Sequence, residues 1–276
     1  MTETLRLTAT AELGFDALAA LFNEAYQGYD VPLHVDAGAV AFMHEAFDLV
    51  PERSCLAWDG ERPVGLVFLG VRGTRGWVGG MGVTPPARRR GIGERLMRQV
   101  IDHAREAGVR TLLLEVLETN TGAKALYEKL GFRTIRKLEV LAWDGVPPPA
   151  VPGVAASDPH VARRRILATR RVPEPWQRAD ETIDRLDVST PALRAVSSAA
   201  GDAIYRVTEG RASVLQMEAR DAEAAGALLD AIRAKPDVTL VRFLNVPSDH
   251  PASVALQNRG AARIASQLEM AIELTA

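Results

Sequence analysis

The sequence predicts an α/β (α+β) protein that is made of two similar domains. Helical and strand-like segments alternate through both halves of the chain. The length of 276 residues corresponds to about two domains, at roughly 150 residues per domain. The order of segments in the first half recurs in the second half, which indicates a repeated fold.

In the first half, apolar residues at helical spacing predict helices over residues 14–26, 37–47, 93–107 and 122–130. Apolar runs predict strands over residues 54–58, 64–71, 77–83, 111–117 and 132–143. The pair Asp59-Gly60 marks a hairpin turn. Gly79, Gly80 and Gly82 interrupt the third of these strands, which indicates a bulge or the close approach of a ligand.

A proline-rich segment separates the two halves. Residues 145–153 read GVPPPAVPG, and prolines disfavour both helix and sheet hydrogen bonding. We therefore expect a first domain over residues 1–145, a linker over 146–156 and a second domain over 157–276.

The second half repeats the pattern of the first. We expect strands over residues 193–196, 203–209, 213–218, 239–245 and 261–272, with helices over 221–235 and 251–258. Residues 111–143 align with residues 239–272 when one extra residue is allowed in the second copy. A repeat of this length, with its glycine in the same place, predicts a tandem duplication.

Composition excludes several classes of function. The 33 basic and 35 acidic residues leave a net charge of −2, so no global field attracts nucleic acid. The single cysteine, Cys55, excludes an intrachain disulfide and a cysteine-rich zinc site, and we expect it to be a buried small side chain without a catalytic base. The five histidines show no metal-ligand spacing, so no metal is expected. No apolar run approaches the roughly 18 residues of a membrane span and no signal peptide is evident, which predicts a cytoplasmic protein without a membrane partner.

The most informative segment is residues 81–97, MGVTPPARRRGIGERLM. A strand ends at Val83, and Arg88-x-x-Gly91-x-Gly93 then leads into an amphipathic helix. Glycines at a helix N-terminus leave backbone N–H groups free to bind an anion, and arginine suits phosphate. A dinucleotide fingerprint is excluded because Leu96 stands where a third glycine is needed. A basic surface turn and a nucleic-acid patch formed by Arg88, Arg89 and Arg90 stay open as alternatives.

A second pattern follows this segment. Glu115, Asn120 and Tyr127 are spaced as E-x4-N-x6-Y, and Leu130-Gly131-Phe132 comes next. With these motifs, residues 1 to about 145 resemble the GCN5-related N-acetyltransferase (GNAT) family. The resemblance implies a mixed, mostly antiparallel sheet flanked by helices in each domain, and acetyl-CoA as cosubstrate.

The resemblance also implies roles for particular residues. Tyr127 is similar to the residue that protonates the departing coenzyme A thiolate, and Glu115 lies where some members carry a general base. The implied cofactor contacts are Met81, Gly82, Val83, Arg88, Arg89, Arg90, Gly91, Ile92, Gly93, Glu94 and Asn120. Three simpler interpretations stay open: Tyr127 as core, Glu115 as a structural carboxylate that positions water or Arg133, and Asn120 as a helix N-cap.

The acceptor of such an enzyme enters past the first two helices. Tyr29 and Asp30 lie in that connection, and Trp77 can line the site from the sheet. Trp176, in the unusual segment 172–177, either caps the acceptor site or docks the two domains.

The second half lacks this chemistry. Phe243 aligns with Glu115 and Leu256 with Tyr127, and no segment matches the Arg-x-x-Gly-x-Gly loop. We expect a degenerate GNAT-like domain that is incomplete at its start, with residues 161–186 replacing the opening helices.

The predicted function is an N-acetyltransferase that moves the acetyl group of acetyl-CoA to a primary amine of a small molecule or peptide. Transfer is direct, in a ternary complex, in a monomer or homodimer. The alternatives are an acyl-CoA-binding regulatory module without turnover, a mycothiol-synthase-like tandem acetyltransferase, and a nucleic-acid binder that uses Arg88, Arg89 and Arg90.

Overall fold

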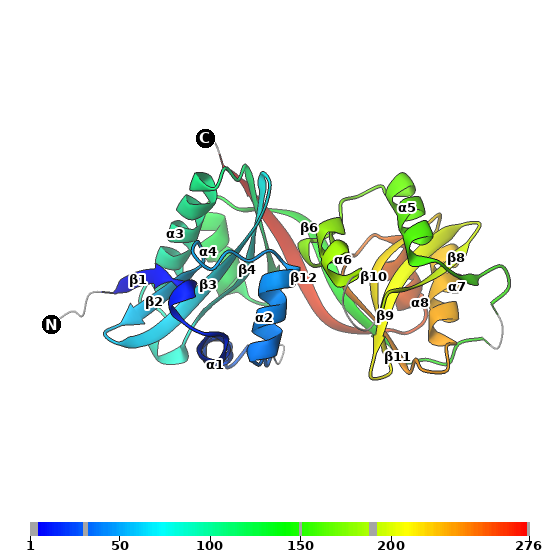
Figure 1. Cartoon of the computed structure of the whole chain (residues 1–276), viewed down its shortest axis with the longest axis horizontal. Helices are drawn as coiled ribbons and strands as arrows, with labels where there is room; N and C mark the ends of the chain where they lie inside the picture. Colours follow the sequence, from blue (N-terminus) through cyan, green and yellow to red (C-terminus); the bar gives the residue numbers. More distant parts are fainter. Residues whose placement is uncertain (1–4, 30–32, 149–150, 188–191, 275–276) are drawn as a thin grey trace. The chain divides into compact units, whose positions relative to one another are not determined.

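The structure is a computed structural model of the 276-residue chain, and it describes residues 5–29, 33–148, 151–187 and 192–274. The chain forms two compact units. The first unit contains residues 1–135 together with residues 268–276, and the second contains residues 136–267 (Figure 1). Each unit is a mixed sheet with helices packed on it, as expected for the predicted fold class.

The sheet of the first unit has the strand order β1-β2-β3-β4-β5-β12. Neighbouring strands from β1 to β4 are antiparallel, whereas β4 and β5 are parallel. The strands are β1 (Arg6–Ala9), β2 (Cys55–Asp59), β3 (Arg62–Arg72), β4 (Arg75–Val83), β5 (Thr111–Leu117) and the end of β12 (Ala262–Glu273). The helices are α1 (Phe15–Ala25), α2 (Ala37–Ala46), α3 (Ile92–Glu106) and α4 (Thr121–Lys129), with short 3-10 helices at Thr10–Glu12 and Pro85–Ala87.

These helices cover both faces of the sheet, because side chains of a strand alternate between faces. Phe68 of β3 lies against Phe22 of α1, with ring centroids 6.4 Å apart. Its neighbours Val67 and Leu69 pack in the opposite core with α3 and α4. Figure 1 shows α1 and α2 on one face and α3 and α4 on the other.

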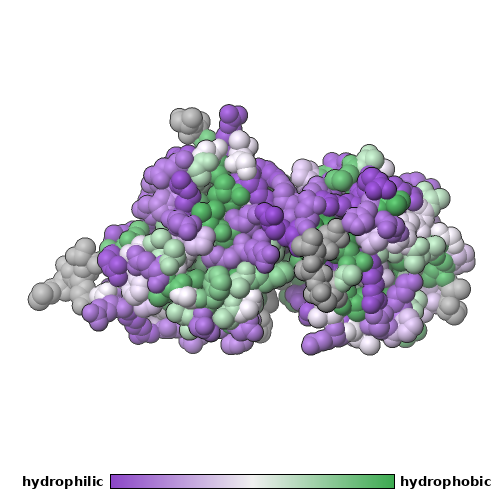
Figure 2. Space-filling model, in the orientation of Figure 1, coloured by the Kyte–Doolittle hydropathy of each residue, from purple (hydrophilic) through white to green (hydrophobic). Residues whose placement is uncertain are grey.

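Some apolar surface remains on the face of α1 and α2. Phe15 of α1 is 42% exposed and Phe42 of α2 is 46% exposed. Figure 2 shows hydrophobic residues on this side of the first unit, among polar surroundings.

Strands β4 and β5 separate partway along their length. Their pairing covers Arg75–Val78 of β4 and Thr111–Leu114 of β5. On the other side of β4, Phe68 pairs with Gly80 and Leu69 with Val78, so Gly79 is the extra residue of a β-bulge. A Cβ on Gly79 would lie 2.6 Å from the Trp77 ring, which only glycine avoids. The predicted bulge is confirmed, and it lies where the two strands part.

The second unit repeats the same order of elements. Its sheet order is β6-β11-β10-β9-β8-β7. The strands are β6 (Arg133–Trp143), β7 (Ala155–Ser157), β8 (Arg194–Ser198), β9 (Gly201–Thr208), β10 (Arg211–Ala219), β11 (Leu240–Pro247) and the first part of β12. The helices are α5 (Pro159–Thr169), α6 (Asp180–Asp187), α7 (Ala222–Arg233) and α8 (Pro251–Asn258), with a 3-10 helix at Trp176–Arg178.

The expectation that the second half is incomplete at its start was wrong. β7, α5 and α6 occupy the places of β1, α1 and α2 in the order of elements. The parallel pair recurs too, with Arg211–Val214 of β10 beside Leu240–Phe243 of β11. A bulge at Leu215 of β10 matches the bulge at Gly79 of β4. Residues 161–186 escaped sequence recognition because the apolar stripe of α5 and α6 is interrupted by many charged residues.

The last strand of each half packs in the other half's unit. Leu141 and Trp143 of β6 belong to the core of the second unit. Met270 of β12 and the following Leu274 belong to the core of the first unit, and Leu274 N donates to Arg110 O at 2.6 Å. The compact units therefore differ from the ranges 1–145 and 157–276, because local sequence patterns cannot show which sheet a strand joins.

Candidate active site

The N-terminus of α3 offers unpaired backbone donors. Gly91 is the N-cap, with φ 75, and no side chain in the described part of the chain caps the helix. The preceding Arg89 also has a positive φ, of 64. The first amides of a helix have no intrahelical acceptor and carry a partial positive charge. This end of α3 is therefore suited to an anion such as a pyrophosphate.

The predicted arginine triplet separates into different roles. Arg88 donates to the carbonyl oxygens of Val83 (3.0 Å), Ala25 (3.0 Å) and Gln27 (2.8 Å), so it fastens the end of α1 to β4. Arg90 pairs with Asp59 at 2.6 Å. Arg89 makes no hydrogen bond or ion pair with another described residue, so among the three its guanidinium is the one not engaged by protein groups in the described part of the chain.

Glu94 connects α3 to α4. Its carboxylate accepts hydrogen bonds from Lys129 at 2.6 Å and from Arg98 at 2.8 Å. These bonds hold the pKa of Glu94 below its usual value. The Glu94 side chain therefore holds α3 and α4 together. A contact between the cofactor and the Glu94 backbone N–H stays a prediction.

The predicted cofactor segments meet at Gly93. A Cβ on Gly93 would lie 3.7 Å from Met81 Sδ and 3.7 Å from Leu126 Cδ2. The end of β4, the start of α3 and the side of α4 are thus brought together. Asn120 is the N-cap of α4 and accepts from Ala123 N at 3.1 Å, as the simpler interpretation held.

Tyr127 lies on α4, with its side chain 6% exposed and its ring 6.0 Å from that of Phe132. Burial raises its pKa well above the usual 10.0, and nearby Tyr26 and Tyr29 add to the shift. No described residue hydrogen-bonds to its hydroxyl. A phenol of such high pKa transfers its proton poorly to a thiolate of pKa about 8.5 but remains a hydrogen-bond donor.

Glu115 lies on β5, one residue beyond the last residue that pairs with β4. Trp77 Nε1 donates to its Oε2 at 2.8 Å. Trp77 is 4% exposed and packs edge-on against Phe47, with ring centroids 5.6 Å apart. The structure thus gives Trp77 the role of orienting Glu115, while a contact between Trp77 and the acceptor stays a prediction.

The other predicted acceptor residues are dispersed. Tyr29 is half-buried and lies edge-on to Tyr26, with ring centroids 5.1 Å apart. Asp30 lies outside the described residues. Trp176 is in the second unit and its side chain is 1% exposed, so packing in that unit accounts for it and gives no support for a substrate contact.

Cys55 has a histidine nearby that the sequence did not indicate. His103 Nδ1 lies 3.6 Å from Cys55 Sγ and 2.8 Å from Arg53 O. A carbonyl can only accept, so this nitrogen carries the proton and cannot act as a base toward the thiol. Cys55 is 1% exposed, and burial raises its pKa to about 12. The thiol is therefore unsuited to nucleophilic catalysis.

The second unit fills the places that the first unit leaves open. Asp221 is the N-cap of α7 and accepts from Ala224 N at 2.8 Å. Its carboxylate, whose pKa this bond lowers, occupies the helix end that would hold a pyrophosphate. Phe243 and Leu256, aligned with Glu115 and Tyr127, are both buried.

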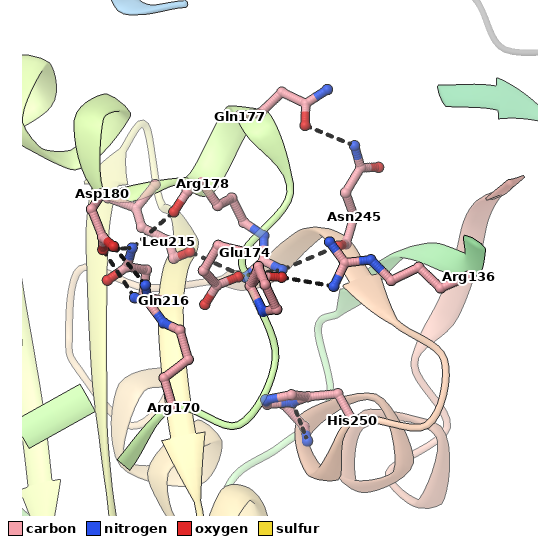
Figure 3. Close-up of polar contacts among 12 residues, drawn as sticks. Arg136, Arg170, Glu174, Gln177, Arg178, Asp180, Leu215, Gln216, Asn245 and His250 are labelled. Carbon is pink, nitrogen blue, oxygen red and sulfur yellow. Dashed lines mark hydrogen bonds and ion pairs between the residues drawn. The ribbon is translucent and has the colours of Figure 1, made fainter. Parts of the chain in front are cut away.

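Arg178 closes the gap between the parting strands of the second unit. Its guanidinium donates to Leu215 O of β10 at 3.2 Å and to Asn245 O of β11 at 3.1 Å. Glu174 pairs with it at 2.9 Å, and both side chains are buried. Figure 3 shows Arg178 between Leu215 and Asn245. No local sequence pattern indicates this role of Arg178, because its partners are distant in the chain.

Two further observations concern the described residues alone. None of their helices is long and apolar enough to cross a membrane. Within the same part of the chain, no group of three or more His, Cys, Asp or Glu side chains is arranged to hold a metal ion.

Residues 15–132 match the acetyltransferase (GNAT) family. These residues, which make up less than half of the chain, are similar to the GNAT family, whose members use acetyl-CoA.

Relatives match short parts of the chain. The ribosomal protein bS18-alanine N-acetyltransferase of Escherichia coli is 45% identical over 65 residues, which are 23% of this chain and 44% of the relative. A mycothiol acetyltransferase of Geodermatophilus obscurus is 39% identical over 84 residues, 28% of this chain and 27% of the relative. The chain thus spans less than half the length of these relatives.

Solved structures share the fold over nearly the whole chain. A GCN5-related N-acetyltransferase from Sphaerobacter thermophilus has a TM-score of 0.74 at 17% identity, covering 98% of this chain and 95% of that chain. A tandem GNAT protein from the clavulanic acid biosynthesis pathway has a TM-score of 0.66 at 18% identity, covering 99% of each chain. The tandem arrangement of two GNAT-like folds agrees with the duplication read from the sequence.

Proposed function

We propose that the protein is an acetyl-CoA-dependent N-acetyltransferase whose first unit acetylates a primary amine of a small molecule or peptide. The observation that carries the proposal is the uncapped N-terminus of α3 beside the point where β4 and β5 part. Glu115 on β5 and Tyr127 on α4 flank this point. The names of the matched relatives, an alanine N-acetyltransferase and a mycothiol acetyltransferase, support acetyl transfer.

The chain's own groups suit the parts of acetyl-CoA. The backbone N–H groups at Gly91 to Glu94 and the Arg89 guanidinium would hold the pyrophosphate. The outward edge of β4 at Met81 and Val83, beyond its pairing with β5, would face the pantetheine arm. The cosubstrate supplies the activated thioester.

Each residue then has a defined task in acetyl transfer. An amine is mostly protonated at neutral pH, and the Glu115 carboxylate, oriented by Trp77, takes its proton directly or through water. As the C–N bond forms and the C–S bond breaks, the Met81 N–H stabilises the carbonyl oxygen. The Tyr127 hydroxyl donates a hydrogen bond to the departing sulfur, and solvent supplies the final proton.

Calorimetry with acetyl-CoA tests the cofactor site. We expect one cofactor per chain, because Asp221 and Arg178 fill the second unit's equivalent places. Gly91→Glu should abolish binding, since it puts a carboxylate at the helix end and strains a residue with φ 75. Gly108→Glu is the matched control: Gly108 follows the other end of α3 with φ 76 and, like Gly91, has no atom within 4 Å of an added Cβ.

Two results would contradict the cofactor site. Binding that survives Gly91→Glu would exclude the α3 terminus, and a stoichiometry of two would exclude a degenerate second unit. Loss of binding in both variants would show that the effect is one of stability.

An acceptor screen separates turnover from mere binding. Acetylated amines are detected by mass spectrometry, which a free thiol on the acceptor does not disturb. Acetyl-CoA binding without any product would favour a regulatory module. A mycothiol-acetyltransferase-like activity is the second candidate, because of the 39% identity to such a protein over 84 residues. The screen therefore compares a peptide with N-terminal alanine against a cysteinyl amine.

A further inference from the structure

Tyr26, the residue after α1, lies along the glycines of β4. Its ring stacks on Phe22, with centroids 4.2 Å apart. A Cβ on Gly82 would lie 3.3 Å from the Tyr26 ring, and a Cβ on Gly80 would lie 3.4 Å from the Tyr26 hydroxyl oxygen. The phenol therefore reaches the part of β4 that β5 has left.

The backbone of β4 directs the Met81 amide toward the part of the strand that β5 has left. Thr84 N donates to Val64 O of β3 at 2.9 Å, and Gly82 and Gly80 follow in register opposite Leu66 and Phe68. Hydrogen-bonding direction alternates along a strand, so the N–H groups of Gly80 and Gly82 point to β3 and that of Met81 points away. The pairing of β4 with β5 ends at Val78, and the Met81 N–H faces the Tyr26 hydroxyl closely enough to offset part of the rise that burial causes in the pKa of Tyr26.

Arg88 fixes Tyr26 in this position. It donates to the carbonyl oxygens of Ala25 and Gln27, the two residues that flank Tyr26, and to Val83 O of β4. The first residue of the proposed pyrophosphate loop thus fastens Tyr26 against the strand.

We propose that the Tyr26 hydroxyl occupies, in the free protein, the Met81 amide that receives the acyl carbonyl oxygen of the bound thioester. The inference rests on the proposed function and deepens it. One N–H donates one good hydrogen bond, so the carbonyl must displace the hydroxyl when acetyl-CoA binds. Coenzyme A has no acyl carbonyl and leaves the hydroxyl in place. Tyr26 is thereby a positioning residue that sets the relative affinity for acetyl-CoA and coenzyme A.

The test is Tyr26→Phe, with dissociation constants for acetyl-CoA and coenzyme A measured by calorimetry on the full chain. In the variant the Met81 amide lacks its protein acceptor before binding, so acetyl-CoA should bind about five-fold more tightly. Affinity for coenzyme A should not change. Tyr29→Phe is the matched control, because it removes a hydroxyl from the same ring cluster and should leave the affinity ratio unchanged. Thermal melting of both variants checks that they are folded.

Other outcomes would overturn the inference. An unchanged ratio, or an equal change for both ligands, would show that Tyr26 does not compete with the carbonyl. Weaker binding of acetyl-CoA alone would make the hydroxyl a donor to the carbonyl instead. If the wild-type protein binds neither ligand, the proposed function itself fails, and this inference fails with it.

Discussion

Tyr127 shows how tertiary packing alters the acid strength expected of a residue type. An exposed tyrosine is a modest acid, and the motif implied proton donation to coenzyme A. Burial raises the pKa of Tyr127 well above 10.0, so the phenol stays protonated throughout the working range. It can still stabilise a departing sulfur by donating a hydrogen bond.

Tyr127→Phe should lower kcat by about 100-fold, because the departing thiolate loses its donor. Affinity for acetyl-CoA should change by less than about two-fold, since the ring is retained. Steady-state kinetics and calorimetry measure the two quantities. The wild-type rate should show no alkaline decline from Tyr127 below about pH 10. An unchanged kcat would leave Tyr127 with a packing role alone.

Individual site residues were predictable to different degrees. The N-cap of α4 at Asn120 was one of two interpretations that the sequence offered, because capping depends on a few neighbouring residues. Gly91 was expected in the loop before a helix starting at Gly93, and it is the N-cap of that helix. The role of Arg88 was not predictable, because its acceptors Ala25 and Gln27 lie 63 and 61 residues away in the sequence. The residues around Arg88 in the sequence do not distinguish an arginine that binds a ligand from one that holds α1 against β4.

At the scale of elements, the two helix N-termini that follow β4 and β10 have opposite chemistry. Gly91 leaves α3 uncapped, whereas the Asp221 carboxylate caps α7. Both units share a β-bulge and a parallel strand pair. We expect only the uncapped end of α3 to accept an anion, because the Asp221 carboxylate fills the end of α7.

The cap of α8 gives a pH-dependent prediction. His250 Nδ1 accepts from Ala252 N at 3.1 Å, which requires a neutral ring. Burial lowers the pKa of His250 from 6.5 to about 4, with nearby Arg178 contributing. A depressed histidine pKa means that the unfolded chain takes up the proton first. Stability is then complete above pH 6.5 and falls as the pH drops toward 4, by up to about 3 kcal/mol.

His250→Asn should keep the cap and remove this pH dependence, because asparagine caps helices without titrating. Amide hydrogen exchange of α8 at about pH 7 and about pH 4.5, corrected for intrinsic rates, compares the two proteins. The wild type should lose more protection than the variant over this interval. Parallel losses of protection would assign the acid sensitivity to groups other than His250.

At the scale of the whole chain, the last strand of each half packs in the other half's unit, so residues near the C-terminus belong to the core of the first unit. Met270 is fully buried in the core of α3 and β5, although it lies near the C-terminus. The proline-rich segment predicted a domain boundary at residues 146–156. Most of β6 nevertheless belongs to the second unit, and the end of β12 belongs to the first.

Met270→Ala should therefore destabilise the first unit by about 2–5 kcal/mol. Hydrogen exchange should accelerate in α3 and β5 and remain unchanged in α7 and α8. Ile264→Ala is the control on the same strand, since Ile264 is 45% exposed and lies in the second unit's part of β12. Acceleration confined to the second unit would refute the assignment of Met270 to the core of the first unit.

The sequence by itself determined the alternation of helices and strands, the duplication and the similarity of residues 15–132 to the GNAT family, and it predicted an anion-binding loop. These depend on periodicity, turns and caps, which a short stretch of chain specifies. The tertiary structure alone decided that Arg88 fastens α1 to β4, that Arg178 bridges β10 and β11, that Tyr26 lies along the glycines of β4, and which sheet each last strand joins. The physical reason is that these outcomes depend on hydrogen bonds and buried contacts between residues far apart in the chain, whose proximity only folding creates.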